Sequence, residues 1–269
     1  NMYCLHTNSF HYYSIEAAVE AAKQAHLSGL EIAAVKGWTE HIMPSFTEKR
    51  IEEIVEKCKG ANLQIRSMSG HCDLRDPERR RDFIKNIELA SRLGCKTIVT
   101  SSGEAHFGVE SRTKDDIELI DGIKTALESC EKNELRLALE THGRYGSGEK
   151  LMELLAKVDH PLLGIAYDTA NVVRHGGVLP ENDILICTEK VCHVHLKDKI
   201  GEADGKSFTA LGKGRIALNR VFQVLDSVRY RGDYSIEVEY FLETGAPKLD
   251  RVVQDILDSA AWLRSIGRI

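Results

Sequence analysis

Four strand-like runs in the second half of the chain each end with a group that could bind a metal ion or move a proton: Glu140, Asp168, His195 and Glu237. Successive residues of a strand face opposite sides, so each run has two faces. In every run the bulky apolar residues share one face, and the polar groups share the other with small neighbours. Three carboxylates that converge with an imidazole in one interior would repel one another unless a cation neutralised them. We therefore predict one metal site.

The predicted donor set indicates which metal it would bind. One imidazole and three carboxylates are hard, oxygen-rich ligands, which favour Mn²⁺ or Mg²⁺ and are compatible with Co²⁺ or Zn²⁺. The alternative interpretation is that one or two of the acids form ordinary ion pairs with Lys197, Arg66 or Arg144, because interior acids usually have partners.

Eight β-rich runs alternate with amphipathic helices along almost the whole chain. We expect strands at residues 2–6, 29–34, 63–69, 97–102, 136–142, 163–171, 191–198 and 234–240. We expect helices at residues 14–26, 47–58, 77–94, 113–130, 147–159, 183–190, 219–230 and 247–267, with Ser14, Thr47 and Pro77 at three of the starts and Gly94 at one end.

This alternation predicts an α/β fold, a closed (β/α)8 TIM barrel that forms a single domain over residues 1–269. A doubly wound open sheet is the main alternative. Against it, no GxGxxG turn follows the first strand, and at least four strands carry polar residues on one face. In a barrel the carboxyl ends of the strands form the catalytic face, and all four candidate ligands lie near such ends.

Composition limits the partners. The 269 residues carry a net charge of -5 with mixed signs and no broad basic stripe, so we expect no nucleic acid partner. The seven cysteines are scattered and contain no CxxC pair, which indicates reduced thiols and a cytoplasmic protein. No apolar run approaches the roughly 20 residues of a membrane span, so we expect no membrane partner.

The segments LALETHG, AYDTANVVRHGG, VCHVHLKDKIG, LGKG and YSIEVEY stand in an order and spacing that resembles the xylose isomerase-like superfamily of sugar isomerases and epimerases. The resemblance covers nearly the whole chain. It implies one divalent cation bound by Glu140, Asp168, His195 and Glu237, with Glu140 and Glu237 also exchanging protons with the substrate. It also selects His195 over His193, although the two could be reversed.

Such a site would act on a small sugar or sugar phosphate. A carboxylate removes a proton beside a carbonyl, and a cation stabilises the resulting enediolate as a Lewis acid. Returning the proton to the other face of the same carbon gives epimerisation, and returning it to the next carbon gives isomerisation.

Three positions depart from the ketose 3-epimerases that the chain resembles. Asn171, Gly146 and Gly201 stand where those enzymes typically have a histidine, a glutamate and an arginine. The substrate pocket is therefore expected to differ. Inosose and dehydroshikimate dehydratases use a similar metal site, so a dehydratase is the alternative function.

Two further functions are compatible with a barrel of this kind. An apurinic endonuclease would need further histidines and an aspartate for three metals, and Asn171 replaces one of those histidines. A sugar-binding barrel that kept the metal without catalysis is the other.

Other polar residues near the predicted strand ends are candidates for substrate binding: Lys197, His142, Asn171, His71 and Trp38. For Lys197 an ion pair with an interior acid is the equal alternative, and Trp38 could instead anchor loop packing. His106 and Glu104 are further candidates, either as pocket residues or as loop caps, and LGKGR gives a weak anion-binding signal. Barrels of this kind are often homo-oligomers, but no interface is readable from one chain.

Overall fold

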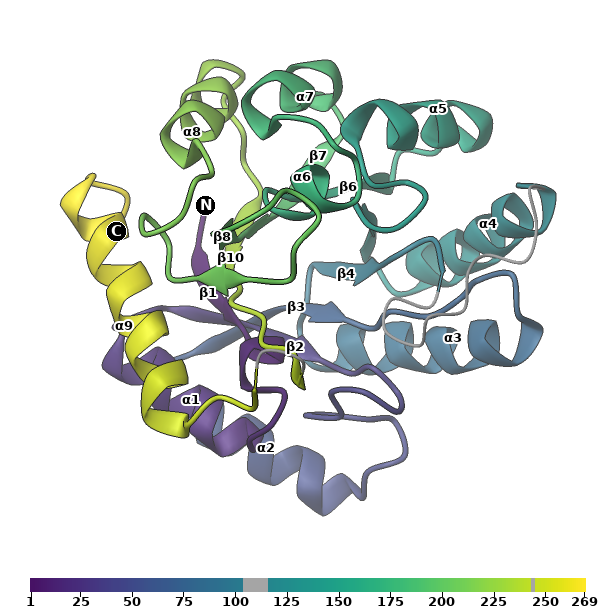
Figure 1. Cartoon of the computed structure of the whole chain (residues 1–269). Helices are drawn as coiled ribbons and strands as arrows, with labels where there is room; N and C mark the ends of the chain where they lie inside the picture. The colour runs from purple at the N-terminus through teal and green to yellow at the C-terminus, as the bar shows by residue number, and fades with distance from the viewer. Residues whose placement is uncertain (104–115, 243–244) are drawn as a thin grey trace.

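The computed structural model describes residues 1–103, 116–242 and 245–269. Eight parallel strands close into a barrel in the order β1, β10, β7, β6, β5, β4, β3, β2, and helices surround it (Figure 1). The strands are β1 (Tyr3–His6), β2 (Gly29–Ala33), β3 (Gln64–Ser69), β4 (Thr97–Thr100), β5 (Arg136–Glu140), β6 (Leu163–Asp168), β7 (Val191–Leu196) and β10 (Asp233–Ile236). The predicted (β/α)8 TIM barrel is confirmed.

The helices follow the strands in sequence and form the outer layer. They are α1 (Ile15–Gln24), α2 (Glu48–Gly60), α3 (Pro77–Arg92), α4 (Ile117–Lys132), α5 (Gly148–Val158), α6 (Asn171–Arg174), α7 (Pro180–Cys187), α8 (Leu218–Ser227) and α9 (Leu249–Ser265). A 3-10 turn η1 (Thr7–Phe10) follows β1, and a small antiparallel pair, β8 (Asp198–Lys199) and β9 (Phe208–Thr209), follows β7. Helix α9 lies beside α1 and so completes the ring (Figure 1).

The strands divide their side chains as the alternation predicts. Large apolar residues such as Leu137, Leu139 and Ile165 belong to the main core, which lies between the sheet and the helices. Small residues form a separate cluster of Val99, Ala138 and Ala166. Small side chains on the inward face leave room for polar groups at the strand ends.

The helix starts show local capping chemistry. The side chains of Ser14 and Thr47 each accept a hydrogen bond from a backbone N–H in the first turn of α1 and α2. Asp76 does the same for α3, where Pro77 occupies the first turn. Gly94 follows the end of α3 with a φ of 80°, a conformation that favours glycine.

Some element boundaries differ from the predictions. The strand expected at 136–142 ends at Glu140, and the strand expected at 234–240 ends at Ile236, where its ladder with β7 stops. The helix expected at 183–190 is α7, which begins earlier because Pro180 suits a first turn, where its missing N–H costs nothing. Helix α4 begins at Ile117, and residues 113–115 of its expected span lie outside the described residues.

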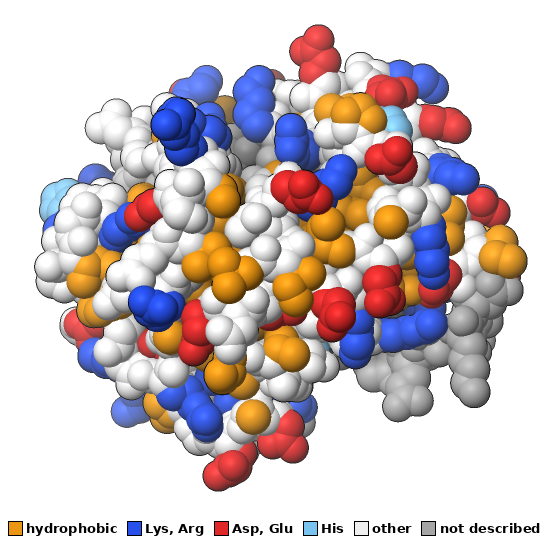
Figure 2. All heavy atoms as spheres, turned by 90° about the horizontal axis from the view of Figure 1, so that it is seen from above, with side chains coloured by type: hydrophobic (Ala, Val, Ile, Leu, Met, Phe, Trp, Pro, Cys, Tyr) orange, Lys and Arg blue, Asp and Glu red, His pale blue; other side chains and the backbone are white. Residues whose placement is uncertain are grey.

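The cysteines and the surface agree with the composition. All seven cysteines are free thiols, six of them buried. Figure 2 shows Lys and Arg side chains interspersed with Asp and Glu over one face of the molecule. Among the described helices, none has the length and apolar character needed to cross a membrane.

Candidate metal centre

The four predicted ligands stand at the carboxyl ends of four neighbouring strands, β5, β6, β7 and β10. Glu140 ends β5 and Asp168 ends β6. His195 pairs with Asp168 in the β6–β7 register. Glu237 directly follows β10, and its N–H donates to the carbonyl of Leu196 at 3.0 Å. The closed barrel therefore delivers all four side chains to one end.

The four side chains converge in space. One donor atom from each of Glu140, Asp168, His195 and Glu237 lies within 4.8 Å of the other three, and all four residues are buried. His195 Nδ1 lies 2.8 Å from Glu140 Oε1, 3.8 Å from Glu237 Oε2 and 3.9 Å from Asp168 Oδ2. We call these four residues the acidic cluster.

Glu31 on β2 is a buried residue that the sequence analysis did not select. Its carboxylate lies 3.0 Å from His195 Nε2, 2.6 Å from His193 Nε2 and 3.5 Å from His6 Nε2. The signal was present, because Glu31 sits between the outward Leu30 and Ile32 just as Glu140 follows Leu139. The Glu31 carboxylate contacts Nε2 of His195, and the other ring nitrogen, Nδ1, faces the acidic cluster.

The two histidines of β7 have different surroundings. His195 contacts both Glu31 and the acidic cluster, whereas His193 groups with Glu31 and accepts or donates a hydrogen bond with Ser235 Oγ at 3.2 Å. This supports the choice of His195 as the ligand.

Lys197 pairs with several of the acids. Its Nζ lies 3.3 Å from Asp168 Oδ2 and 3.3 Å from Glu237 Oε2, and it also contacts Glu239. Asn8, on η1, donates to Glu237 Oε1 at 2.9 Å and was likewise missed by the sequence analysis. Lys197 therefore forms the ion pairs of the alternative interpretation, and the residue also lines the cavity at the barrel mouth.

The charges of the acids are set by their neighbours as well as by burial. Burial alone would raise the pKa of each carboxylate. For Glu140 the neighbouring imidazoles, of which His71 contributes most, hold the pKa well below its ordinary value. For Glu237 the Lys197 ammonium lowers the pKa to about 2. For Asp168 burial prevails over Lys197 and raises the pKa to about 7.

The two bases of the centre respond in the opposite way. Burial alone would lower the pKa of His195, but the carboxylates of Glu31 and Glu140 raise it well above 6.5. Burial would also lower the pKa of Lys197, and the carboxylates around it raise that pKa well above 10.5. Both groups therefore supply positive charge to the acidic cluster at neutral pH.

The predicted substrate-binding residues fall into two groups. Lys197, His142, Asn171 and His71 line the cavity at the barrel mouth, together with Glu140 and Glu237. Trp38 does not belong to that lining and stacks on His11, with ring centroids 3.9 Å apart. His106 and Glu104 lie outside the described residues.

Two sequence features have local structural explanations. The backbone N–H groups of Gly212 and Gly214 in LGKGR each donate to Asp198 Oδ2 at 3.0 Å, so a side chain already occupies this anion-binding turn. A Cβ at Gly146 would lie 2.6 Å from the backbone of His175. The loops after β5 and β6 therefore leave no room for the glutamate that ketose 3-epimerases typically have at that position.

The acidic cluster fits a divalent cation. It offers three carboxylates and one imidazole with mutually close donor atoms, and Glu140 and Glu237 line the mouth cavity of about 10 Å³. The arrangement resembles a catalytic metal centre at the carboxyl face of a (β/α)8 barrel.

Comparison with known proteins gives the family. The model of the xylose isomerase-like TIM barrel family matches residues 19–266, so the chain belongs to that family. Among curated relatives, it is 25% identical over 198 residues to an inosose dehydratase of Clostridium beijerinckii, covering 60% of this chain and 63% of that protein. It is 29% identical over 192 residues to a probable endonuclease 4 of Shouchella clausii, covering 63% and 62%. The matches thus span less than two thirds of these relatives.

Solved structures show the same fold at low identity. A D-psicose 3-epimerase crystallised in the presence of D-fructose has a TM-score of 0.80 at 13% identity and covers 100% of both chains. The IolI protein with a bound zinc atom has a TM-score of 0.79 at 14% identity and covers 99% of both chains.

Proposed function

We propose that this protein is a divalent-metal-dependent isomerase or epimerase of a sugar or sugar phosphate. The convergence of Glu140, Asp168, His195 and Glu237 at the carboxyl end of the barrel carries the proposal. Family membership supports it, because the relatives and structural neighbours include a sugar epimerase and a zinc-binding barrel protein.

The four side chains of the acidic cluster would hold the cation. It would supply Lewis-acid stabilisation of negative charge that develops on substrate oxygens. With a cation bound, Glu31 would hold the proton on His195 Nε2, and the lone pair of Nδ1 would face the acidic cluster.

The protein groups would then move the protons. Glu140 and Glu237 both line the mouth cavity and reach it from strands on different sides of the acidic cluster. One would take a proton from the carbon beside the carbonyl, and the other would return a proton to the opposite face or to the next carbon. Lys197 would donate a hydrogen bond to a substrate oxygen, since this residue lines the same cavity.

The test is proton exchange. The Mn²⁺-loaded protein is incubated in D₂O with a panel of ketoses, aldoses and their phosphates, and deuterium incorporation is followed by NMR. We expect exchange that is lost on chelation. In Glu237→Gln, assayed at a Mn²⁺ concentration that saturates its weakened site, we expect exchange to fall by roughly 10²–10⁴-fold, and in Glu153→Gln on α5 we expect no change. Full exchange after demetallation, or full turnover in Glu237→Gln, would contradict the proposal.

A dehydratase is the second candidate, favoured by the similarity to inosose dehydratase. One of Glu140 and Glu237 would remove the proton beside the carbonyl. The other would protonate the hydroxyl on the next carbon, which would leave as water. The panel separates the two functions, because elimination consumes substrate and gives an unsaturated carbonyl compound that absorbs in the ultraviolet, whereas isomerisation and epimerisation conserve the formula.

A further inference from the structure

A second cavity adjoins the mouth of the barrel. It lies between the segment after β2 and helix α3, and His71 lines both cavities. The walls are also continuous along the chain, because Ala34 lines the second cavity and Val35 the mouth, and Gly70 lines the second and Ser69 the mouth. A molecule held at the acidic cluster could therefore extend past His71.

The two cavities differ in size. The mouth cavity measures about 10 Å³ and the second cavity about 200 Å³. Because the mouth cavity is so small, the second cavity offers the larger space for the body of a substrate beside the proposed reacting centre.

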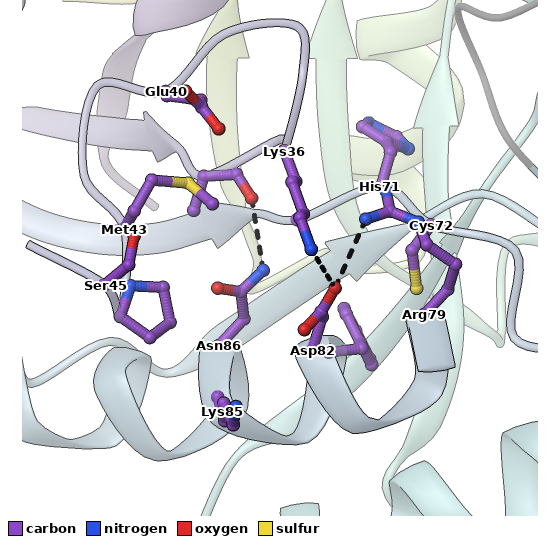
Figure 3. Close-up of a pocket in the computed structure, with 14 residues that line it drawn as sticks. Lys36, Glu40, Met43, Ser45, His71, Cys72, Arg79, Asp82, Lys85 and Asn86 are labelled. Atoms are coloured by element: carbon purple, nitrogen blue, oxygen red, sulfur yellow. Dashed lines mark hydrogen bonds and ion pairs between the residues drawn. The ribbon is translucent and has the colours of Figure 1, made fainter. Parts of the chain in front are cut away.

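The lining of the second cavity combines apolar walls with donors and acceptors. Phe83 and Met43 are buried in its wall. Lys36 Nζ lies 2.9 Å from Asp82 Oδ2, and Arg79 lies 3.5 Å from the same oxygen. Figure 3 shows Lys36 reaching from the segment after β2 toward Asp82 on α3.

Asn86 adds an acceptor. The residue is only 6% exposed, and its Nδ2 donates to the carbonyl of Ala34 at 3.1 Å. Its Oδ1 has no hydrogen-bond partner among the described residues. A buried acceptor without a partner costs free energy, and a hydroxyl group of a ligand would remove that cost.

The charge of the lining favours an uncharged ligand. Three basic residues line the cavity with two acidic ones, and Asp82 pairs with both Lys36 and Arg79. A phosphate would have to separate these pairs and lie against the two carboxylates, whereas hydroxyl groups can donate to Asp82 and Asn86 and accept from Lys36. We propose that this cavity binds an uncharged, hydroxyl-rich part of the substrate. The substrate class is then a neutral sugar or glycoside, an inference that rests on the proposed function.

The experiment measures binding without turnover. Chelator-treated protein is mixed with D-fructose, D-glucose, maltose, D-fructose 6-phosphate and D-glucose 6-phosphate, and dissociation constants are obtained by ligand-observed NMR. In the wild type we expect at least one neutral sugar to bind more tightly than the phosphates. In Asp82→Asn the cavity becomes more positive and loses an acceptor, so the ratio should shift toward the phosphates by about fivefold. Glu56→Gln, whose carboxylate pairs with Lys59 on the exposed face of α2, should leave the ratio unchanged.

The outcomes separate this inference from the proposed function. Deuterium exchange with an unchanged binding ratio in Asp82→Asn would overturn the cavity assignment and leave the isomerase proposal standing. Absence of exchange, together with the expected shift, would support a neutral-sugar site in a protein without that activity. Binding of the phosphates alone, or of no compound in the panel, would overturn the inference.

Discussion

At the scale of single residues, Glu31 decides how His195 meets the acidic cluster. Its carboxylate lies 3.0 Å from His195 Nε2 and 2.6 Å from His193 Nε2, and it is completely buried. A carboxylate behind a metal-ligating histidine fixes the ring orientation and raises the basicity of the ligand nitrogen. Glu31 is thus a positioning residue that does not itself line the mouth cavity.

Glu31→Gln should weaken Mn²⁺ binding by roughly 10–100-fold. A carboxamide carries no negative charge, so it holds the N–H of His195 Nε2 less strongly and raises the basicity of Nδ1 less than the carboxylate does. Isothermal titration calorimetry with Mn²⁺ measures the effect, and circular dichroism checks the fold. Glu20→Gln on the exposed face of α1 is the matched control. Equal affinity in Glu31→Gln and the wild type would show that His195 needs no such support.

Metal binding should also release protons. In the metal-free protein the pKa of His195 lies well above 6.5 and that of Asp168 is about 7, so both bind protons at neutral pH. A cation needs the unprotonated forms, so apparent affinity should rise as the pH increases toward these pKa values. Calorimetry at pH 7 in two buffers of different ionisation enthalpy counts the protons. Identical heats in both buffers would rule out the release.

At the scale of elements, the alternation along the strands predicted most of the fold and of the proposed metal site. It placed Glu140, Asp168, His195 and Glu237 on the same face of their strands, and in the structure these four side chains meet at one end of the closed barrel. Glu31 was not predicted, because it is the one polar residue in the run 29–34 and lies between two large apolar residues, Leu30 and Ile32.

Other features could not be predicted from local pattern. The β8–β9 pair joins residues that the sequence separates by a turn-rich segment, and the second cavity depends on how α3 packs against the segment after β2. Both are set by tertiary packing. Neither leaves a periodic signal in the sequence.

The segment after β7 depends on one carboxylate. Asp198 Oδ2 accepts hydrogen bonds from the backbone N–H groups of Gly212 and Gly214. Its Oδ1 accepts from the backbone N–H of Lys199 at 2.9 Å and from that of Ile216 at 3.1 Å. Asp198→Ala should lower the free energy of unfolding by about 3 kcal/mol, since buried N–H groups lose a charged acceptor. Asp198→Asn keeps one acceptor oxygen and should lose less. Urea denaturation measures both, and wild-type stability in Asp198→Ala would contradict this account.

At the scale of the whole molecule, the acidic cluster couples metal binding to the stability of the barrel, because its four ligands come from β5, β6, β7 and the end of β10. A cation that binds only the folded chain stabilises it by about 2.7 kcal/mol at a hundredfold excess over Kd. For a chain of this size that corresponds to a rise in Tm of roughly 5–10 °C.

The prediction is checked by differential scanning calorimetry of chelated protein with and without Mn²⁺, Mg²⁺, Co²⁺ or Zn²⁺. At least one ion should raise Tm in the wild type. Glu140→Gln should lose most of the rise because it replaces a ligand oxygen in the acidic cluster, whereas Glu153→Gln, on the surface of α5, should keep it. A rise of the same size in Glu140→Gln would mean that the ion stabilises the protein at another place, and no rise with any of the four ions would remove the metal centre from the proposal.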